Sequence, residues 1–219
     1  MILLHTTKYG DSSIILHGFT REQGRKSFII RGAGKTKGSN STALLHPLSI
    51  LETEIRPGAE YSIAQLRDYS AKYPLHSLRS SVVKNTIAIY ISELLYRTLR
   101  DSESDPSLYD FLESSIVTLN ALESDYGNFH IWFTIKYISL LGFMPDSASL
   151  MAFTNFEPWQ REVLGQFLTL KTEEAMKLPL RREWKNEFVG ALIRFLEQNL
   201  GQRIEIKSVN VLQIGRAHV

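Results

Sequence analysis

Residues 2–33 read ILLHTTKYGDSSIILHGFTREQGRKSFIIRGA, and this stretch decides how the chain begins to fold. Three short apolar runs lie within it, over residues 2–6, 12–20 and 27–33. Turn formers separate these runs, first at Tyr9–Asp11 and then around Gly24. Short apolar runs bounded in this way predict strands, and glycine permits the backbone conformation of a tight connection. We therefore expect three consecutive strands, with buried positions at Ile14, Leu16 and Phe19.

Two further strands are expected downstream of this stretch. Residues 44–55 read LLHPLSILETEI, in which Leu48, Ile50 and Leu51 alternate imperfectly with polar residues. Pro57-Gly58 predicts a turn, and residues 61–69 predict a fifth short strand. Five short strands joined by glycine-containing turns favour a small closed barrel.

From about His76 the hydrophobic period changes from that of strands to that of helices. Apolar side chains recur at helical spacing between residues 77 and 101. Further helices are expected over residues 106–123, 129–143, 158–170 and 180–200, and Gly201 stands where the last of them should end. The sequence thus predicts an α+β protein with a barrel over 1–72 and an all-helical domain over 76–213.

The composition is that of a globular protein, with 43% apolar and 22% charged residues. The chain has no cysteine, which excludes disulfides and thiolate zinc sites. The apolar run 129–143 contains His130 and Lys136 and is shorter than a membrane span, so we expect a buried helix with His130 in the core. No secretory signal pattern is visible at the start, and we expect a cytoplasmic protein.

The net charge of +2 hides an asymmetry along the chain. Residues 1–50 carry seven Lys/Arg and two Asp/Glu, whereas residues 101–125 carry seven acids and no base. One end of the chain is therefore suited to meet an anion. A basic surface that contacts only solvent, and binds no anion, explains the same charge count equally well.

The motif GAGKT at 32–36 resembles the end of a nucleotide-binding phosphate loop. Such a loop needs a glycine five residues before the Gly-Lys pair, where this chain has Ile29, and a helix that begins at the lysine. Residues 36–42 read TKGSNST and show no apolar periodicity. We interpret the motif as a strand that runs into a basic loop, not as an ATPase site.

The sequence offers no arrangement of residues typical of an enzyme. No two of the histidines at 5, 17, 46, 76, 130 and 218 have the spacing that metal ligands prefer, and no nucleophile elbow is present. Glu52 and Glu54 share one face of a strand, where paired carboxylates are usually just solvated. We therefore expect neither catalysis nor a cofactor or metal.

A basic cluster is the strongest candidate for a binding site. It comprises Arg21, Arg25, Lys26, Arg31, Lys35 and Lys37, opposed only by Glu22. Small barrels bind single-stranded nucleic acid with a cationic groove and exposed aromatic rings. Tyr9, Phe19 and Phe28 are the nearby aromatic residues; Phe28 fits the core better than a stacking surface.

The order of several motifs resembles the RecO family of bacterial recombination mediators, in a form like that of the Bacteroidetes. The resemblance rests on the Tyr-Gly-Asp turn, the Phe-Thr-Arg-Glu-x-Gly-Arg hairpin, the Arg-Gly-Ala step and the Leu-Gly-Phe-x-Pro helix end. It covers about residues 2–213. It implies an N-terminal OB-fold barrel that binds DNA, over 1–72, and a helical domain over 76–213.

The resemblance also implies a function without catalysis. Members of the family bind single- and double-stranded DNA, anneal complementary strands, interact with RecR and with the C-terminal tail of single-strand-binding protein, and help load RecA. For the tail, Lys136 and Arg194 are candidate partner-binding residues at the edge of an apolar groove. Read from the residues alone, a protein-interaction adaptor whose basic face meets an acidic partner is the alternative.

The chain departs from the family pattern in three places. The four-cysteine zinc site of many relatives is absent, Gly34 stands where the family usually has a base, and relatives begin several residues earlier. The final residues 214–219 read IGRAHV and match the translation of a common sequencing-adapter read. We interpret them as an artefact.

Overall fold

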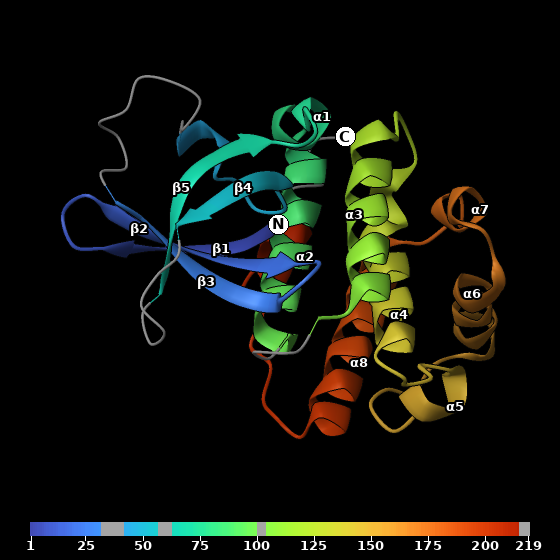
Figure 1. Cartoon of the computed structure of the whole chain (residues 1–219). Helices are drawn as coiled ribbons and strands as arrows, with labels where there is room; N and C mark the ends of the chain where they lie inside the picture. Colours follow the sequence, from blue (N-terminus) through green and yellow to red (C-terminus); the bar gives the residue numbers. More distant parts are fainter. Residues whose placement is uncertain (32–41, 57–62, 100–103, 215–219) are drawn as a thin grey trace. The chain divides into compact units, whose positions relative to one another are not determined.

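The computed structural model of the chain describes residues 1–31, 42–56, 63–99 and 104–214. Its strands are β1 (Ile2–Tyr9), β2 (Ser13–Thr20), β3 (Gly24–Arg31), β4 (Leu51–Arg56) and β5 (Ala64–Ala71) (Figure 1). Gly24 has a φ of 65°, a left-handed conformation that glycine adopts without strain, and it joins β2 to β3 as expected. The α+β prediction, with five strands followed by helices, is confirmed.

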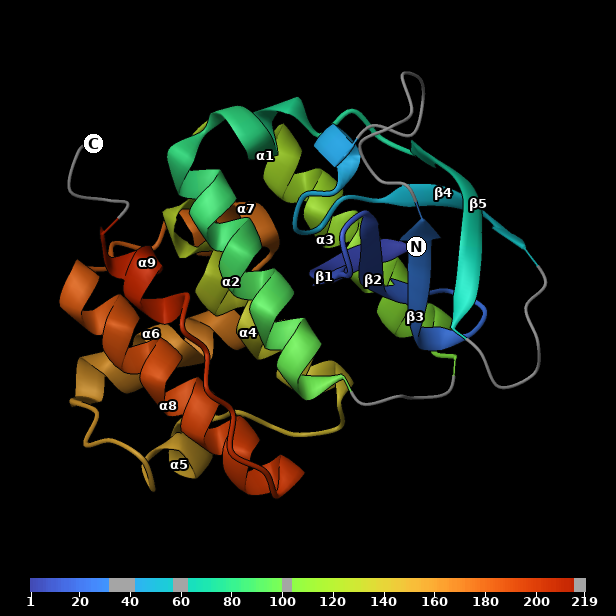
Figure 2. The same cartoon turned by 90° about the vertical axis from the view of Figure 1, so that its left-hand side faces the viewer.

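The five strands form one sheet in the order β1-β2-β3-β5-β4. All neighbours are antiparallel except β3 and β5, which lie side by side in Figure 2 and pair in parallel. An isolated antiparallel bridge joins Ile2 of β1 to Ile50, the residue directly before β4. The Leu3 N–H donates to the Ser49 carbonyl oxygen at 2.9 Å in the same region. The expected closed barrel is therefore wrong in one respect: the described strands form the partly open five-stranded barrel of the OB-fold, because only an isolated bridge links its two ends.

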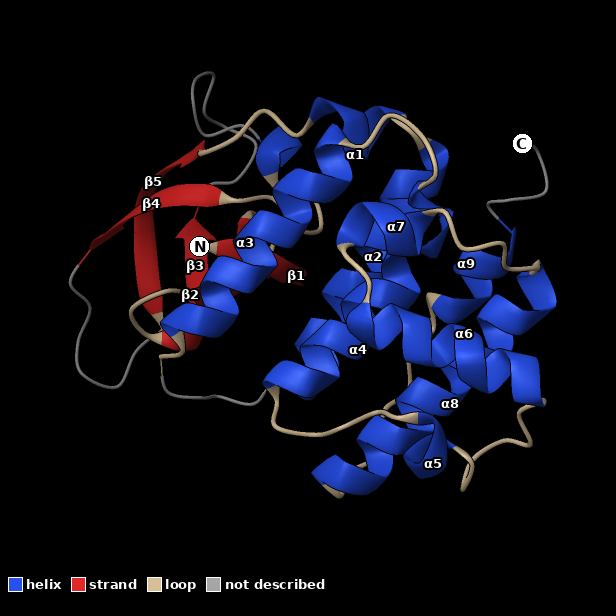
Figure 3. Cartoon of the chain, turned by 90° about the vertical axis from the view of Figure 1, so that its right-hand side faces the viewer, coloured by secondary structure: helices blue, strands red, loops and turns tan. Residues whose placement is uncertain are grey.

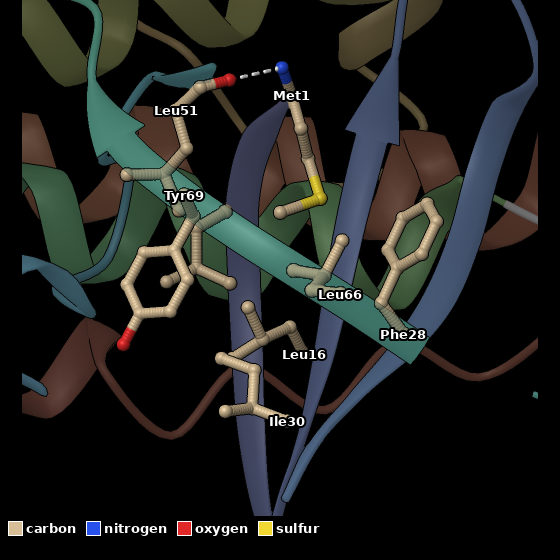
Figure 4. Packing of buried hydrophobic residues seen from close by; sticks show 8 residues of the cluster. Met1, Leu16, Phe28, Ile30, Leu51, Leu66 and Tyr69 are labelled. Carbon is tan, nitrogen blue, oxygen red and sulfur yellow. Dashed lines mark hydrogen bonds between the residues drawn. The ribbon is translucent and has the colours of Figure 1, made fainter. Parts of the chain in front are cut away.

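Apolar side chains from all five strands fill the barrel interior. Figure 4 shows part of this core, which comprises Met1, Leu3, Leu16, Phe28, Ile30, Leu51, Leu66 and Tyr69. Leu16 is fully buried and Phe28 is 2% exposed, so Phe28 is a core residue. Leu16, Phe28 and Ile30 are two residues apart or paired across β2 and β3, so they lie on the face that packs against the core. Both faces are buried toward the end of β2 and over Phe28–Ile30 of β3.

The fourth strand is shorter than the sequence pattern predicts. The expected strand covered residues 44–55, but β4 begins only at Leu51. A short 3-10 helix, η1, occupies Thr42–Leu44, and Leu48 has a φ of 60°. A left-handed residue cannot continue an extended strand, so the apolar run is divided although Leu48 itself is buried.

The longer helical regions agree with the expected spans to within a few residues, apart from one break. The helices are α1 (His76–Ser80), α2 (Val82–Thr98), α3 (Pro106–Ala121), α4 (Phe129–Leu140), α5 (Ser147–Leu150), α6 (Pro158–Thr169), α7 (Thr172–Met176), α8 (Arg182–Leu200) and α9 (Val209–Ile214), with the 3-10 helix η2 (Tyr126–Asn128) (Figure 3). The short helices α5, α7 and α9 are additions that the sequence pattern did not predict. The helix expected from residue 77 is interrupted at Ser81, which is extended with a ψ of 119°. Val82 is consequently 70% exposed rather than part of an apolar face.

The chain divides into two compact units. One contains Met1–Ser81 and Ile91–Asn120, and the other contains Val82–Tyr90 and Ala121–Val219. The domain boundaries expected from the sequence, 1–72 and 76–213, stay a prediction. Within the described ranges, none of the helices combines the length and hydrophobicity that crossing a membrane requires.

The second unit is built around α4, which is buried over most of its surface. His130 on this helix is 3% exposed and meets the ring of Tyr90 edge-on, so it is a core residue as expected. Buried Asn128 donates its amide to the carbonyl oxygens of Ala175, Met176 and Leu178 at the end of α7. Gly201, with a φ of 61°, ends α8 as the sequence predicts.

Candidate nucleic-acid interface

Strands β1, β2 and β3 have a second face opposite the barrel core, which we call the outer face. Residues paired across antiparallel strands lie on the same side of a sheet, and successive residues alternate between sides. Leu16, Phe28 and Ile30 point into the core. Their neighbours in sequence therefore form the outer face.

The strand register arranges the outer face in four rows. The rows are Tyr9–Ser13–Arg31, Thr7–Ile15–Ile29, His5–His17–Ser27 and Phe19–Arg25. Consecutive rows lie about 7 Å apart, because each step covers two residues of a strand. Tyr9, at one end, is 59% exposed. The outer face thus carries arginines at both ends, with two isoleucines and two imidazole rings in the rows between them.

Contacts with α2 hold Arg25 in place at the far end of the outer face. The guanidinium carbon lies 4.6 Å from the ring centroid of Tyr96, and Nη1 donates to the Leu99 carbonyl oxygen. A guanidinium has five N–H donors in a fixed plane, so a single carbonyl leaves others for an anion. An arginine that is already oriented loses less conformational freedom when it binds a phosphate.

The other predicted DNA-binding residues are distributed differently. Arg21 lies in the β2–β3 turn, where it forms an ion pair with Asp110 of α3. Lys26 is exposed and pairs with Gly18. Because it follows Arg25 directly in β3, it points to the opposite side of the sheet from Arg25. Lys35 and Lys37 lie outside the described residues. The structure therefore brings Tyr9, Arg25 and Arg31 onto one face and gives Arg21 a carboxylate partner.

Two of the three aromatic residues considered from the sequence are excluded as stacking surfaces by burial. Phe28 belongs to the barrel core, and Phe19 is fully buried on the outer face, 6.3 Å from the ring of Tyr109. Burial raises the pKa of Tyr109 to about 12, so its hydroxyl stays neutral at physiological pH. Helix α3 therefore covers the outer face at Phe19, and Tyr9 remains the exposed ring.

The opposite side of the barrel is acidic. Strands β4 and β5 surround an open hollow of about 260 Å³ lined by Glu52, Thr53, Glu54, Asp68, Tyr69 and Ser70. Arg67 offsets part of this charge by pairing with Glu54 at 2.8 Å. Carboxylates repel phosphates, so this hollow is unfavourable for an anionic polymer.

Sequence reasoning missed three rings on or beside the outer face. The ring centroid of Tyr96 lies 4.6 Å from the ring centroid of His5 and 5.3 Å from that of His17. The strand alternation predicts that His17 shares a face with Arg25. No local pattern predicts that Tyr96, far away in the sequence, lies beside them.

The two residues proposed to bind a partner lie at different places in the second unit. Lys136 on α4 donates to the Leu168 carbonyl oxygen on α6 at 2.9 Å. Arg194 on α8 donates to the Phe153 carbonyl oxygen at 2.9 Å. Arg194 also edges an open hollow of about 590 Å³, which is lined by Phe153, Arg194, Glu197, Gln198, Gly201, Gln202 and Arg203.

Comparison with known proteins assigns the chain to a family. The family model described as Recombination protein O N terminal matches residues 1–74, and the one described as Recombination protein O C terminal matches residues 79–216. Together they span most of the sequence.

Similar proteins carry the same family name. A DNA repair protein RecO of Phocaeicola vulgatus is 31% identical over 82% of this chain and 76% of that protein. The DNA repair protein RecO of Azobacteroides pseudotrichonymphae is 26% identical over 96% of this chain and 95% of that protein. One from Porphyromonas gingivalis is 35% identical over 66% of this chain and 60% of that protein. With both of its family models matched, this chain belongs to the RecO family of DNA repair and recombination proteins.

Proposed function

We propose that this protein is a DNA-binding mediator of recombinational repair that acts without catalysis. The observation that carries the proposal is the outer face of β1–β3. Tyr9 is exposed beside Arg31, and Arg25 is held by α2 at the other end. Phosphate contacts by arginines, together with base stacking on an exposed ring, are how small barrels hold single strands of any sequence. The DNA-binding domain in this proposal covers residues 1–72.

Annealing of complementary strands follows from the same arrangement. Two DNA strands repel each other through their phosphates, so a protein that speeds their pairing must screen this charge and leave the base edges free. Side chains on an open strand surface meet both requirements, whereas a closed base-reading pocket does not. We propose that the protein binds single- and double-stranded DNA and anneals strands without ATP, with Lys35 and Lys37 adding to the screening.

The proposal includes partners that act on the same DNA. We propose binding to RecR and to the C-terminal tail of single-strand-binding protein, which would let the protein help load RecA at covered gaps in the nucleoid of the cytoplasm. The hollow beside Arg194 supports the tail proposal, because Phe153 offers apolar surface while Arg194 and Arg203 offer positive charge. An acidic-aromatic peptide needs both kinds of contact.

A salt titration tests the function directly. The Kd for labelled oligothymidylate and for an acidic peptide of equal charge should be measured at several salt concentrations. We expect log affinity for the oligonucleotide to fall with log salt by about 0.7 for each phosphate contacted. Strand annealing, followed by fluorescence, should proceed equally with and without ATP. Tight binding of the acidic peptide without binding of DNA would instead identify a protein-interaction adaptor.

The placement of the tail is tested by charge removal in the second unit. Arg194→Ala combined with Lys136→Ala should weaken binding of the tail peptide roughly tenfold, as expected for lost charge-assisted contacts worth about 1.4 kcal/mol. Fluorescence anisotropy of a labelled peptide measures this change. Lys171→Ala, which removes an exposed charge elsewhere in the unit, serves as the control. Unchanged affinity in the double variant rules out both residues.

A further inference from the structure

Two histidines stand next to each other in the middle of the outer face. His5 and His17 are directly paired across β1 and β2. Their rings are stacked, with centroids 5.9 Å apart and planes inclined by 22°. His5 is exposed and His17 is half-buried. The pair therefore lies on the surface between Arg31 and Arg25, where a bound DNA backbone would run.

Hydrogen bonds orient His17 in a way that suits either protonation state. Its Nε2 lies 3.2 Å from the Thr7 hydroxyl and its Nδ1 lies 2.9 Å from the Ser27 hydroxyl. A hydroxyl can both donate and accept a hydrogen bond. The neutral imidazole can donate at one nitrogen and accept at the other, and the imidazolium can donate at both. Protonation of His17 therefore breaks neither contact.

The surroundings of His5 disfavour its protonation while no anion is bound. The polar groups that face it are Thr7 from β1, Arg25 and Ser27 from β3, and Glu93, Tyr96 and Arg97 from α2. Burial and then Arg97 lower the pKa of His5, and Glu93 opposes this shift. Burial and the Arg97 guanidinium thus outweigh the Glu93 carboxylate at the His5 imidazole.

A bound phosphodiester would reverse this balance. Its negative charge would offset the arginines and give a protonated His5 a direct partner, which favours the charged form of histidine. His17, both of whose ring nitrogens contact hydroxyls, would respond to the same charge without contacting it. We propose that His5 and His17 form a phosphate subsite that takes up a proton when single-stranded DNA binds, so that affinity for DNA rises as pH falls. This inference rests on the proposed function, and it assigns a pH dependence to the same outer face.

The direction of the pH effect follows from linkage. A histidine whose pKa is higher in the complex than in the free protein contributes extra affinity. That contribution is fully present below the pKa of the free protein, and it is lost as pH rises through the pKa of the complex. Each histidine whose pKa rises by about one unit adds about tenfold in affinity at low pH. Because histidine titrates near pH 6.5, the effect falls between about pH 5 and 8.

The test is a set of binding isotherms with oligothymidylate, whose bases do not titrate in this range. At constant ionic strength, wild-type affinity should be about tenfold higher near pH 6 than near pH 8. His5→Gln combined with His17→Gln should lose the increase in affinity at lower pH. Glutamine retains hydrogen-bonding capacity but cannot be protonated. His76→Gln, at an exposed position on α1, should retain the wild-type pH dependence.

Two further measurements distinguish the proposed proton uptake from misfolding of the double variant and from a general effect of pH on binding. The single variant His5→Gln changes only the exposed ring and should lose part of the pH dependence. Calorimetry of wild type in buffers with different ionisation enthalpies should show net proton uptake on binding. A double variant that keeps the full pH dependence, or wild type without proton uptake, overturns the subsite and leaves the proposed function standing. Failure of wild type to bind the oligonucleotide at any pH refutes both.

Discussion

Replacing Phe28 with alanine is expected to lower the free energy of unfolding by about 3 to 5 kcal/mol. The ring is 2% exposed in the barrel core, where it packs with Leu16, Ile30 and Leu66. Alanine there removes buried apolar surface and leaves a cavity that the surrounding strands fill only in part. Because a small domain is stable by only about 5 to 15 kcal/mol, the loss is large. Urea denaturation followed by far-UV circular dichroism measures it.

Tyr9→Ala is the matched control for this stability prediction. It removes an aromatic ring that is 59% exposed at the end of β1, and its effect on stability should stay within about 0.5 kcal/mol. Phe28→Leu, which keeps most of the apolar volume, should recover much of the loss. If Phe28→Ala were as stable as Tyr9→Ala, Phe28 would not be a core residue and the barrel packing would be wrong.

Removing Tyr9, Arg25 and Arg31 together is expected to weaken binding of single-stranded DNA by on the order of 100-fold or more. Near 0.1 M salt, the loss of two phosphate contacts lowers affinity about 25-fold. A lost stacking contact costs about 1 to 3 kcal/mol more. The slope of log affinity against log salt should flatten by about 1.4. Anisotropy titrations of labelled oligothymidylate at several salt concentrations measure both quantities.

A variant with the same charge change separates this surface from a general effect of net charge. Arg67→Ala with Arg182→Ala also removes two exposed cations, one from β5 and the other from the start of α8. Its affinity and salt slope should stay near those of wild type. Thermal unfolding should confirm that every variant is folded, since Arg25 also contacts Tyr96. An unchanged salt slope in the folded triple variant would place DNA on another face.

Much of the fold could be predicted because the signals are local. Short apolar runs between turn formers identified β2 and β3, and apolar spacing identified the longer helices to within a few residues. The errors lie where one backbone conformation overrides a pattern. Leu48 turns left-handed inside the apolar run 44–55, and Ser81 is extended inside the helical run 77–101. Pro47, directly before Leu48, is a signal against one continuous strand that the apolar pattern outweighed, whereas Ser81 has no proline or glycine beside it.

The candidate site was predicted in composition but not in arrangement. The sequence showed that cations gather between Arg21 and Lys37, and alternation could assign His17 and Arg25 to one face. It could not show that Asp110 pairs with Arg21, or that Tyr96 lies between the imidazole rings and Arg25. The seven acids of residues 101–125 looked like an independent feature, although Asp110 and Glu113 pair with Arg21 and Lys72.

The sequence by itself determined that strands come before helices along the chain, that thiolate chemistry is absent and that the N-terminal segment is basic. These properties depend on composition and on neighbours a few residues apart. Only the tertiary structure decided which cations are already engaged: Arg21 meets a carboxylate 89 residues away, and Arg25 meets a carbonyl 74 residues away. Such contacts depend on where the folded chain brings distant segments together, and periodicity within one segment carries no information about that path.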